Sequence, residues 1–309
     1  MVLLFMSDSD DPKVWAEALR AFEPDLQVRV WPDVGVAEEI EFALVWLPPP
    51  GMLAGLPGLK LIQSLGAGID HIFSDPDLPR DVPVARLVDD ELTRQMVEYV
   101  TLAVLSRHRR IDRYRRLQAE RRWRPSRSVP LSASRVGVLG LGVIGAAVAT
   151  ALAGLGLAVA GWSRAPKQID RVENFAGAER LDAFLARSDI LVCLLPLTPE
   201  TEGVLNARTL GALPEGAYVI NVGRGGHVVE ADLIAAIDGG HLSGAWLDVF
   251  RSEPLPSDHP FWSHPCVTVT PHVAALTEPA SAAAQVIENI RRARRGREPL
   301  HRVDLSAGY

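Results

Sequence analysis

Three glycines near the middle of the chain form the segment with the clearest chemical potential. Residues 136–145 read VGVLGLGVIG and place Gly140, Gly142 and Gly145 between an apolar strand pattern and a helix pattern of small residues. Gly140 permits a tight turn, Gly142 lets backbone amides approach a phosphate, and Gly145 permits close packing of the helix. Because a helix N-terminus presents unpaired N–H groups and partial positive charge, this turn predicts a dinucleotide site rather than a bare structural turn.

The next strand pattern ends without the acidic residue that usually binds a ribose in such a unit. Residues 157–167 read LAVAGWSRAPK, and Ser163 lies 18 residues after Gly145, close to the spacing of about twenty expected for that acid. A carboxylate there would repel a 2′-phosphate, whereas a hydroxyl and cations bind one. Ser163, Arg164 and Lys167 therefore predict NADP(H) as the preferred cofactor and leave NAD(H) open. The competing interpretation is an exposed basic loop without a ligand.

The elements that must position these turns alternate along the chain. Short runs rich in valine, leucine and isoleucine are separated by helix-length segments, which is typical of parallel sheets with crossover helices. The first third contains the strand candidates VLLFMS, LQVRVW, FALVWL, LKLIQSL and PVARLV. Six more follow: SRVGVLG, LAVAGW, DILVCLL, AYVINV, GAWLDV and CVTVT. We expect an α/β protein with two Rossmann-like domains, the second a doubly wound dinucleotide-binding domain.

Two helix patterns mark the expected domain boundaries. One begins near Thr93 and is expected to cross between the domains. The last helix pattern has Thr277 as a candidate N-cap, Pro279 in its first turn and arginines at its C-terminal end, and it is expected to return to the first domain. This predicts a discontinuous substrate domain of residues 1–98 and 276–309 around a dinucleotide-binding domain of residues 99–275. The apolar stripe of the first helix comprises Met96, Val100, Ala103, Val104 and Ile111.

Composition and charge favour a small soluble partner. The chain has 309 residues, 48% of them hydrophobic, and a formal net charge of −6, which gives no overall attraction to nucleic acid or to anionic membranes. Residues 107–127 contain ten arginines, but acidic residues interrupt the run and a charged helix at a domain cleft or dimer surface explains it. No stretch approaches the roughly 18 to 20 apolar residues of a membrane span. We expect a cytoplasmic protein.

Cysteine and histidine usage predicts neither disulfides nor a metal site. Only Cys193 and Cys266 are present, and Cys193, inside the apolar run ILVCLLP, is expected to be a buried small hydrophobe. His259, His264, Cys266 and His272 fall within fourteen residues. Their spacing is irregular and no second cluster completes a ligand set, so we expect no metal.

Three segments in the second half resemble the D-isomer-specific 2-hydroxyacid dehydrogenase family: INVGRGGHVVEADLIAAI, GAWLDVFRSEPLP and TPHVAA. LGAGIDHI, ALVWLPPP, GLGVIG, the WSR region and the terminal GY extend the resemblance over nearly the whole chain, towards the glyoxylate/hydroxypyruvate reductase branch. It implies an NADPH-preferring reductase of small 2-oxo acids and a homodimer formed through the cofactor domains. Two alternatives stay open: another D-2-hydroxyacid dehydrogenase, such as the D-lactate type, and a non-enzymatic NAD(P)H-sensing protein similar to corepressors.

The resemblance implies three catalytic residues: Arg224 as the arginine that clamps the substrate, Glu253 as a carboxylate partner, and His272 as the acid/base. Reduction of a 2-oxo acid needs a hydride on the carbonyl carbon and a proton on its oxygen, which an imidazolium supplies. A neighbouring carboxylate favours the charged form of histidine. Arginine suits the clamp because its planar fork of donors matches a carboxylate.

The remaining expected contacts divide between substrate and cofactor. By resemblance, Gly66, Ala67 and Gly68 offer backbone amides to the substrate carboxylate, and Trp46, Trp123 and Arg124 are candidate pocket-lining residues. The stretch DDELTRQMVEY departs from the family pattern and leaves the role of that segment in doubt. Asp248 is expected at the nicotinamide carboxamide. The other expected cofactor contacts are Val143, Ile144, Leu195, Pro196 and Val222.

Overall fold

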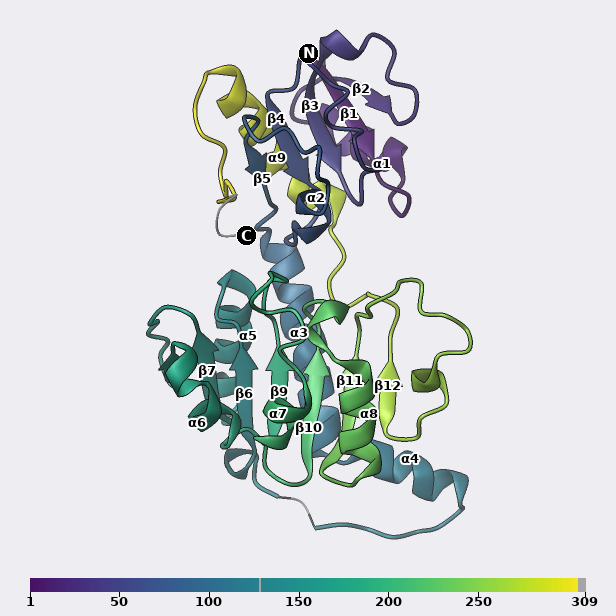
Figure 1. The fold of residues 1–309 in the computed structure, drawn as a ribbon, viewed down its shortest axis with the longest axis vertical. Helices are drawn as coiled ribbons and strands as arrows, with labels where there is room; N and C mark the ends of the chain where they lie inside the picture. The colour runs from purple at the N-terminus through teal and green to yellow at the C-terminus, as the bar shows by residue number, and fades with distance from the viewer. Residues whose placement is uncertain (128, 305–309) are drawn as a thin grey trace. The chain divides into compact units, whose positions relative to one another are not determined.

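The computed structural model describes residues 1–127 and 129–304 (Figure 1). The chain divides into two compact units, one formed by Met1–Leu92 with Leu276–Tyr309 and the other by Thr93–Ala275. The first division falls inside helix α3 (Asp90–His108). The assignment of a substrate role to one unit and a dinucleotide role to the other stays a prediction.

The first unit contains a five-stranded parallel sheet in the order β2-β1-β3-β4-β5. All five strands expected from the apolar runs are present. The order reverses direction between β1 and β3, which is the kind of switch point where open α/β sheets bind ligands. The strands are β1 (Val2–Met6), β2 (Gln27–Val30), β3 (Ile40–Val45), β4 (Leu61–Ser64) and β5 (Val84–Ala85).

Helices α1 (Pro12–Arg20) and α9 (Pro279–Arg294) cover one face of this sheet, and α2 (Asp70–Phe73) covers the other. Strand alternation explains the division: Leu3 and Phe5 pack in the core under α1 and α9, whereas Leu4 and Met6 belong to the core on the opposite face. In Figure 1 the yellow α9 lies beside strands near the N-terminus, so the C-terminal segment completes the first unit.

The start of α9 corrects one expectation. The helix begins at Pro279 as expected, but its N-cap is Glu278 and not Thr277. The hydroxyl of Thr277 instead donates to the carbonyl of Leu65 at 2.6 Å. A tertiary hydrogen bond therefore replaces the local capping interaction that the sequence suggests.

The second unit contains a seven-stranded parallel sheet in the order β12-β11-β10-β9-β6-β7-β8. This is one strand more than expected. The missed strand is β8, whose four-residue sequence ENFA has only two apolar residues and which forms an edge of the sheet. The strands are β6 (Arg135–Leu139), β7 (Ala158–Ser163), β8 (Glu173–Ala176), β9 (Ile190–Cys193), β10 (Ala217–Asn221), β11 (Leu242–Leu247) and β12 (Val267–Val269).

Helices cover both faces of the seven-stranded sheet. Ile190 and Val192 of β9 belong to the core under α3 and α5, whereas Leu191 and Cys193 belong to the core under α6, α7 and α8. Cys193 is fully buried, as expected, and burial raises the pKa of its thiol to about 12. The further helices are α4 (Ile111–Ala119), α5 (Val143–Gly154), α6 (Leu181–Leu185), α7 (Ala207–Gly211) and α8 (Glu230–Asp238).

The long helix α3 differs from its expected form at both ends. It begins at Asp90, before Thr93, and it ends at His108. Arg110 adopts a left-handed conformation with φ of 56° and separates α3 from α4. Ile111 therefore starts a new helix and is 37% exposed, so its assignment to the buried stripe of α3 is wrong. Among the residues described here, no helix is both long and apolar enough to cross a membrane.

Candidate active site

The expected functional residues of the second unit lie at one edge of its sheet. Gly140 follows β6, Ser163 ends β7, Arg224 follows β10, Asp248 follows β11 and His272 follows β12. Because all the strands are parallel, their carboxyl ends meet at one edge. This edge is where doubly wound sheets bind ligands.

The glycine turn after β6 has the geometry that a dinucleotide needs. Gly140 has φ of +105°, which disfavours any other residue. A Cβ on Gly145 would lie 1.9 Å from the carbonyl oxygen of Gly140, so the helix could not approach the turn with a side chain there. A Cβ on Gly142 would meet nothing within 4 Å, and Gly142 caps α5 without a side-chain hydrogen bond. The start of α5 is therefore open to a phosphate.

The loop after β7 presents cations to the glycine turn. The ammonium of Lys167 donates to the carbonyl of Leu141 at 2.6 Å, and Arg164 is exposed in the same loop. Ser163 is 8% exposed and its hydroxyl donates to the carbonyl of Ala165 at 2.8 Å. Its proton is therefore already engaged, and Lys167 and Arg164 are the better candidates to hold a 2′-phosphate. The glycine turn and this loop together fit NADP(H).

The other expected cofactor residues differ in accessibility. Val143 is 48% exposed in the first turn of α5, and Pro196 is exposed after β9. Leu195 and Val222 are buried and pack in the two cores of the unit, while Ile144 is partly buried. Val143 and Pro196 therefore offer surface at this edge, whereas Leu195 and Val222 hold the turns in place.

Glu253 and His272 form a hydrogen-bonded pair. His272 Nδ1 lies 2.7 Å from Glu253 Oε2, and each side chain is about a third exposed, at 34% and 35%. Glu253 Oε1 accepts the amide of Phe250 at 2.8 Å. Partial burial raises the pKa of Glu253, but the hydrogen bonds from His272 and Phe250 and the charges of His272 and Arg224 outweigh it, so the pKa is lowered overall. The glutamate therefore stays ionised beside the imidazole.

Arg224 lies on a tightly built turn after β10. The amide group of Asn221 donates to the carbonyl of Arg224 at 2.9 Å, and the backbone N–H of Arg224 donates to His227 Nδ1 at 3.1 Å. His227 is fully buried, and its Nε2 contacts the carbonyl of Pro196 at 3.2 Å. Because Nδ1 accepts the hydrogen bond from Arg224, the ring proton lies on Nε2, which donates to the carbonyl of Pro196.

The turn also excludes other residues at its centre, since a Cβ on Gly225 would lie 1.8 Å from the carbonyl carbon of Phe250. The charge of Arg224 helps to lower the pKa of Glu253, so the structure brings Arg224, Glu253 and His272 within electrostatic reach.

Asn221 and His227 were missed by the sequence analysis. A polar residue at the end of an otherwise apolar strand and a histidine three residues after Arg224 are the available signals.

Asp248 anchors the turn that carries His272. This carboxylate is fully buried, and it accepts the Thr270 hydroxyl at 2.6 Å and the amides of Val273 and Ala274 at 3.0 and 2.8 Å. The carbonyl of Asp248 also accepts the amide of His272 at 2.8 Å. Because Asp248 is 0% exposed in this structure, its expected contact with the nicotinamide carboxamide stays a prediction. The sequence did not predict that Asp248 anchors this turn.

In the first unit, the expected substrate turn packs against Trp46. A Cβ on Gly66 would lie 2.8 Å from Trp46 Cζ3, and the Trp46 ring lies 4.3 Å from the His71 ring. The amide of Gly66 donates to Ser64 Oγ at 3.2 Å. Within residues 1–127 and 129–304 no acceptor is found for the amides of Ala67 and Gly68. These two amides are thus the better candidates to receive a carboxylate.

The histidines that could suggest a metal site each pair with a different acid. His259 Nε2 lies 3.2 Å from Glu230, and His264 Nε2 lies 3.2 Å from Asp238. In the described parts of the chain, no group of three or more histidine, cysteine or acidic side chains is arranged to hold a metal ion. Trp123 is 97% exposed, so the described residues of this chain do not enclose it and its expected place in a pocket stays a prediction.

Comparison with known proteins places this geometry in a family. The NAD binding domain of D-isomer specific 2-hydroxyacid dehydrogenases matches residues 101–274. A glyoxylate/hydroxypyruvate reductase A of Yersinia enterocolitica is 44% identical over 314 residues, covering all of both chains.

Two solved structures are similar over the whole chain. A D-isomer specific 2-hydroxyacid dehydrogenase of Xanthobacter autotrophicus, in complex with NADPH and MES, is 47% identical with a TM-score of 0.96, covering 100% of this chain and 99% of that one. An NADPH-dependent glyoxylate/hydroxypyruvate reductase of Sinorhizobium meliloti, in complex with NADP and sulfate, is 38% identical with a TM-score of 0.93 and the same coverage. The chain therefore belongs to the D-isomer specific 2-hydroxyacid dehydrogenases, a family of NAD(P)-dependent oxidoreductases.

Proposed function

We propose that this protein reduces small 2-oxo acids, glyoxylate and hydroxypyruvate, to glycolate and D-glycerate with NADPH as the preferred reductant. The observation that carries the proposal is the His272–Glu253 pair, 2.7 Å apart at the sheet edge that also bears the glycine turn. The names of the full-length relatives supply the substrate class.

The cofactor preference rests on the loop after β7. Residues 163–167 read SRAPK and contain two cations but no carboxylate, and Lys167 already contacts the glycine turn. Relatives of known structure hold NADPH or NADP. NAD(H) remains a usable but poorer cofactor, because the turn itself recognises only the shared pyrophosphate.

The residues of the chain perform the proton half of the reaction. NADPH, held by the glycine turn and the loop after β7, would supply the hydride for the carbonyl carbon. Since Nδ1 of His272 contacts Glu253, the proton for the carbonyl oxygen comes from Nε2, and the ionised glutamate stabilises the imidazolium until transfer. Arg224 presents a planar fork to the substrate and stabilises negative charge as it develops. In the first unit, the amides of Ala67 and Gly68 are proposed to bind the substrate carboxylate.

The two alternative functions are not favoured. The curated relatives share the reductase name over the entire chain at 43–44% identity, which does not point to a D-lactate dehydrogenase or a corepressor. The test is a panel of small 2-oxo acids followed at the nicotinamide absorbance with NADPH and with NADH. Turnover of glyoxylate and hydroxypyruvate, faster with NADPH, is expected. Cofactor binding without turnover of any acid would contradict the proposal.

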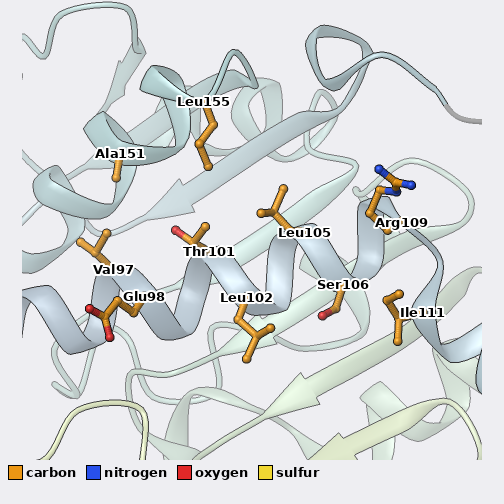
Figure 2. A pocket seen from close by; sticks show the side chains of 10 residues that line it. All are labelled: Val97, Glu98, Thr101, Leu102, Leu105, Ser106, Arg109, Ile111, Ala151 and Leu155. Carbon is orange, nitrogen blue, oxygen red and sulfur yellow. The ribbon is translucent and has the colours of Figure 1, made fainter.

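A homodimer formed through the second unit is the proposed assembly. An apolar groove of about 650 Å³ runs along α3 and includes residues of α4 and α5 (Figure 2). Leu102 and Leu155, which line it, are 56% and 45% exposed. A second copy would cover this surface. The residues lining it are Val97, Glu98, Thr101, Leu102, Leu105, Ser106, Arg109, Ile111, Ala151 and Leu155.

Light scattering after size-exclusion chromatography tests the assembly. Leu102→Asp should yield monomers, because a charge would be buried in the interface. Val14→Asp is the matched control, since Val14 is 49% exposed on α1 and lies outside the groove. A monomeric wild-type protein would contradict the homodimer.

The cytoplasm is the proposed location. Its support is the presence of two free cysteines and no disulfide among the described residues, which suits a reducing compartment. Cell fractionation would test this location.

A further inference from the structure

A chain of side-chain hydrogen bonds runs from the core of the second unit to the turn that carries His272. The indole N–H of Trp246 on β11 donates to the hydroxyl of Tyr99 on α3 at 2.7 Å. Tyr99 Oη contacts Thr270 Oγ1, and the Thr270 hydroxyl donates to Asp248 Oδ1 at 2.6 Å. The catalytic roles described above leave Tyr99, Thr270 and Trp246 without a function.

The direction of each hydrogen bond in this chain is determined. Thr270 uses its single hydroxyl proton to donate a hydrogen bond to Asp248, so it must accept the hydrogen bond from Tyr99. Tyr99 can donate because it keeps its proton: burial, the largest cause, and the charge of Asp248 raise its pKa to about 12, against the lowering effect of its bonds to Thr270 and Trp246. The side chains of Trp246, Tyr99, Thr270 and Asp248 can therefore form all three hydrogen bonds with only one assignment of donors and acceptors.

The chain of hydrogen bonds ends at a turn whose backbone is strained. His272 has φ of 55°, in the left-handed region that residues other than glycine rarely adopt. The amides of Val273 and Ala274 bond to the Asp248 carboxylate, which is fully buried. A strained residue persists where its surroundings fix it, and here the fixing groups are Asp248 and its partners.

We propose that Tyr99 and Thr270 are positioning residues, which hold the Asp248 carboxylate so that the His272 ring is aligned for proton transfer. The inference rests on the proposed reductase function. Both residues act through Asp248 and not by contact with the reacting atoms. Tyr99 also packs edge-on against Trp246, with ring centroids 6.1 Å apart, so the ring and the hydroxyl can be tested separately.

Tyr99→Phe removes the hydroxyl and keeps the ring. It should lower kcat roughly 10- to 100-fold, the scale of a misplaced catalytic group, while the Kd for NADPH measured by fluorescence stays unchanged. The matched control is Tyr218→Phe, because Tyr218 belongs to the same hydrophobic core and its hydroxyl bonds to Thr268 instead. That variant should keep the wild-type kcat.

A second pair of variants and a second measurement complete the test. Thr270→Val should match Tyr99→Phe, whereas Thr270→Ser, which keeps the hydroxyl, should lose far less activity. Hydrogen exchange of the Val273 and Ala274 amides, which needs no turnover, should be faster in Tyr99→Phe and Thr270→Val.

The outcomes separate this proposal from the proposed function. Unchanged kcat and exchange in Tyr99→Phe, or equal losses in Tyr218→Phe, would overturn the positioning role. A wild-type protein that reduces none of the acids would overturn the function, while amide exchange would still decide whether the hydrogen-bond chain holds the turn.

Discussion

Two turns at the same sheet edge are built in opposite ways. In the turn after β6 the functional residues are glycines. Because Gly140, Gly142 and Gly145 have no side chains, the backbone of the turn stays accessible and helix α5 can pack close to it. The turn after β12 instead depends on side chains, because those of Asp248 and Thr270 hold the strained backbone at His272 in place. A glycine turn is therefore visible as a short motif, whereas the second turn depends on partners far away in the sequence.

The largest expected effect comes from removing the acid of the second turn. His272→Ala should reduce kcat by about 10² to 10⁴, the range of general acid catalysis, without weakening NADPH binding, because the glycine turn is untouched. Steady-state kinetics and cofactor fluorescence measure the two effects. Wild-type turnover in this variant would exclude His272 as the proton donor.

The glycine turn can be probed by two identical changes with different consequences. Gly145→Ala places a Cβ 1.9 Å from a carbonyl oxygen, so α5 must shift and NADPH affinity should fall about 100-fold or more. The Cβ that Gly142→Ala adds would meet no protein atom within 4 Å. This variant should therefore fold normally and weaken NADPH binding less than Gly145→Ala does. Thermal unfolding with NADPH titration distinguishes them. Equal thermal stability of the two variants would contradict the packing argument.

A change in the cation loop should alter cofactor choice rather than chemistry. Arg164→Asp should lower kcat/KM with NADPH by roughly 10- to 100-fold, since a hydrogen bond to a charged group contributes about 1.5 to 3 kcal/mol, and should spare NADH. Arg171→Asp is a suitable control, because Arg171 has a side chain 73% exposed and pairs with Asp170. Parallel losses with both cofactors would argue against a 2′-phosphate contact.

The smallest expected effect is a pH-dependent contribution of Glu253 to stability. Its pKa is lowered in the folded protein from an ordinary value of 4.5, so its contribution is present above that value and is lost as the pH falls through the folded pKa. Glu253→Gln should destabilise the protein by roughly 0.5 kcal/mol at neutral pH, a small value because the group is partly exposed.

Urea unfolding at neutral pH and below pH 4.5 measures this effect, and the difference between wild type and Glu253→Gln should shrink in acid. Glu202→Gln, which alters an exposed carboxylate paired with Arg251, is the control. A difference that grows in acid would have the wrong sign for a lowered pKa.

The sequence was sufficient where a local pattern determines the structure. The apolar runs of both sheets and the glycine turn are such patterns, and the family resemblance supplied Arg224, Glu253 and His272. It was insufficient where distant residues decide: Tyr99 and Thr270 meet although they are 171 positions apart. Strand β8 was missed because an edge strand needs few apolar residues. The N-cap of α9 was mispredicted because the hydroxyl of Thr277 bonds to the carbonyl of Leu65 instead.

The contrast between the two thiols offers a practical consequence for labelling. Cys193 is fully buried with a pKa raised to about 12, whereas Cys266 is only partly buried, and the chain has no third cysteine. Since the thiolate is the reactive form, a maleimide dye should attach to the native protein at Cys266 alone. A fluorescent reporter could thus be installed at a defined position without first engineering the cysteines.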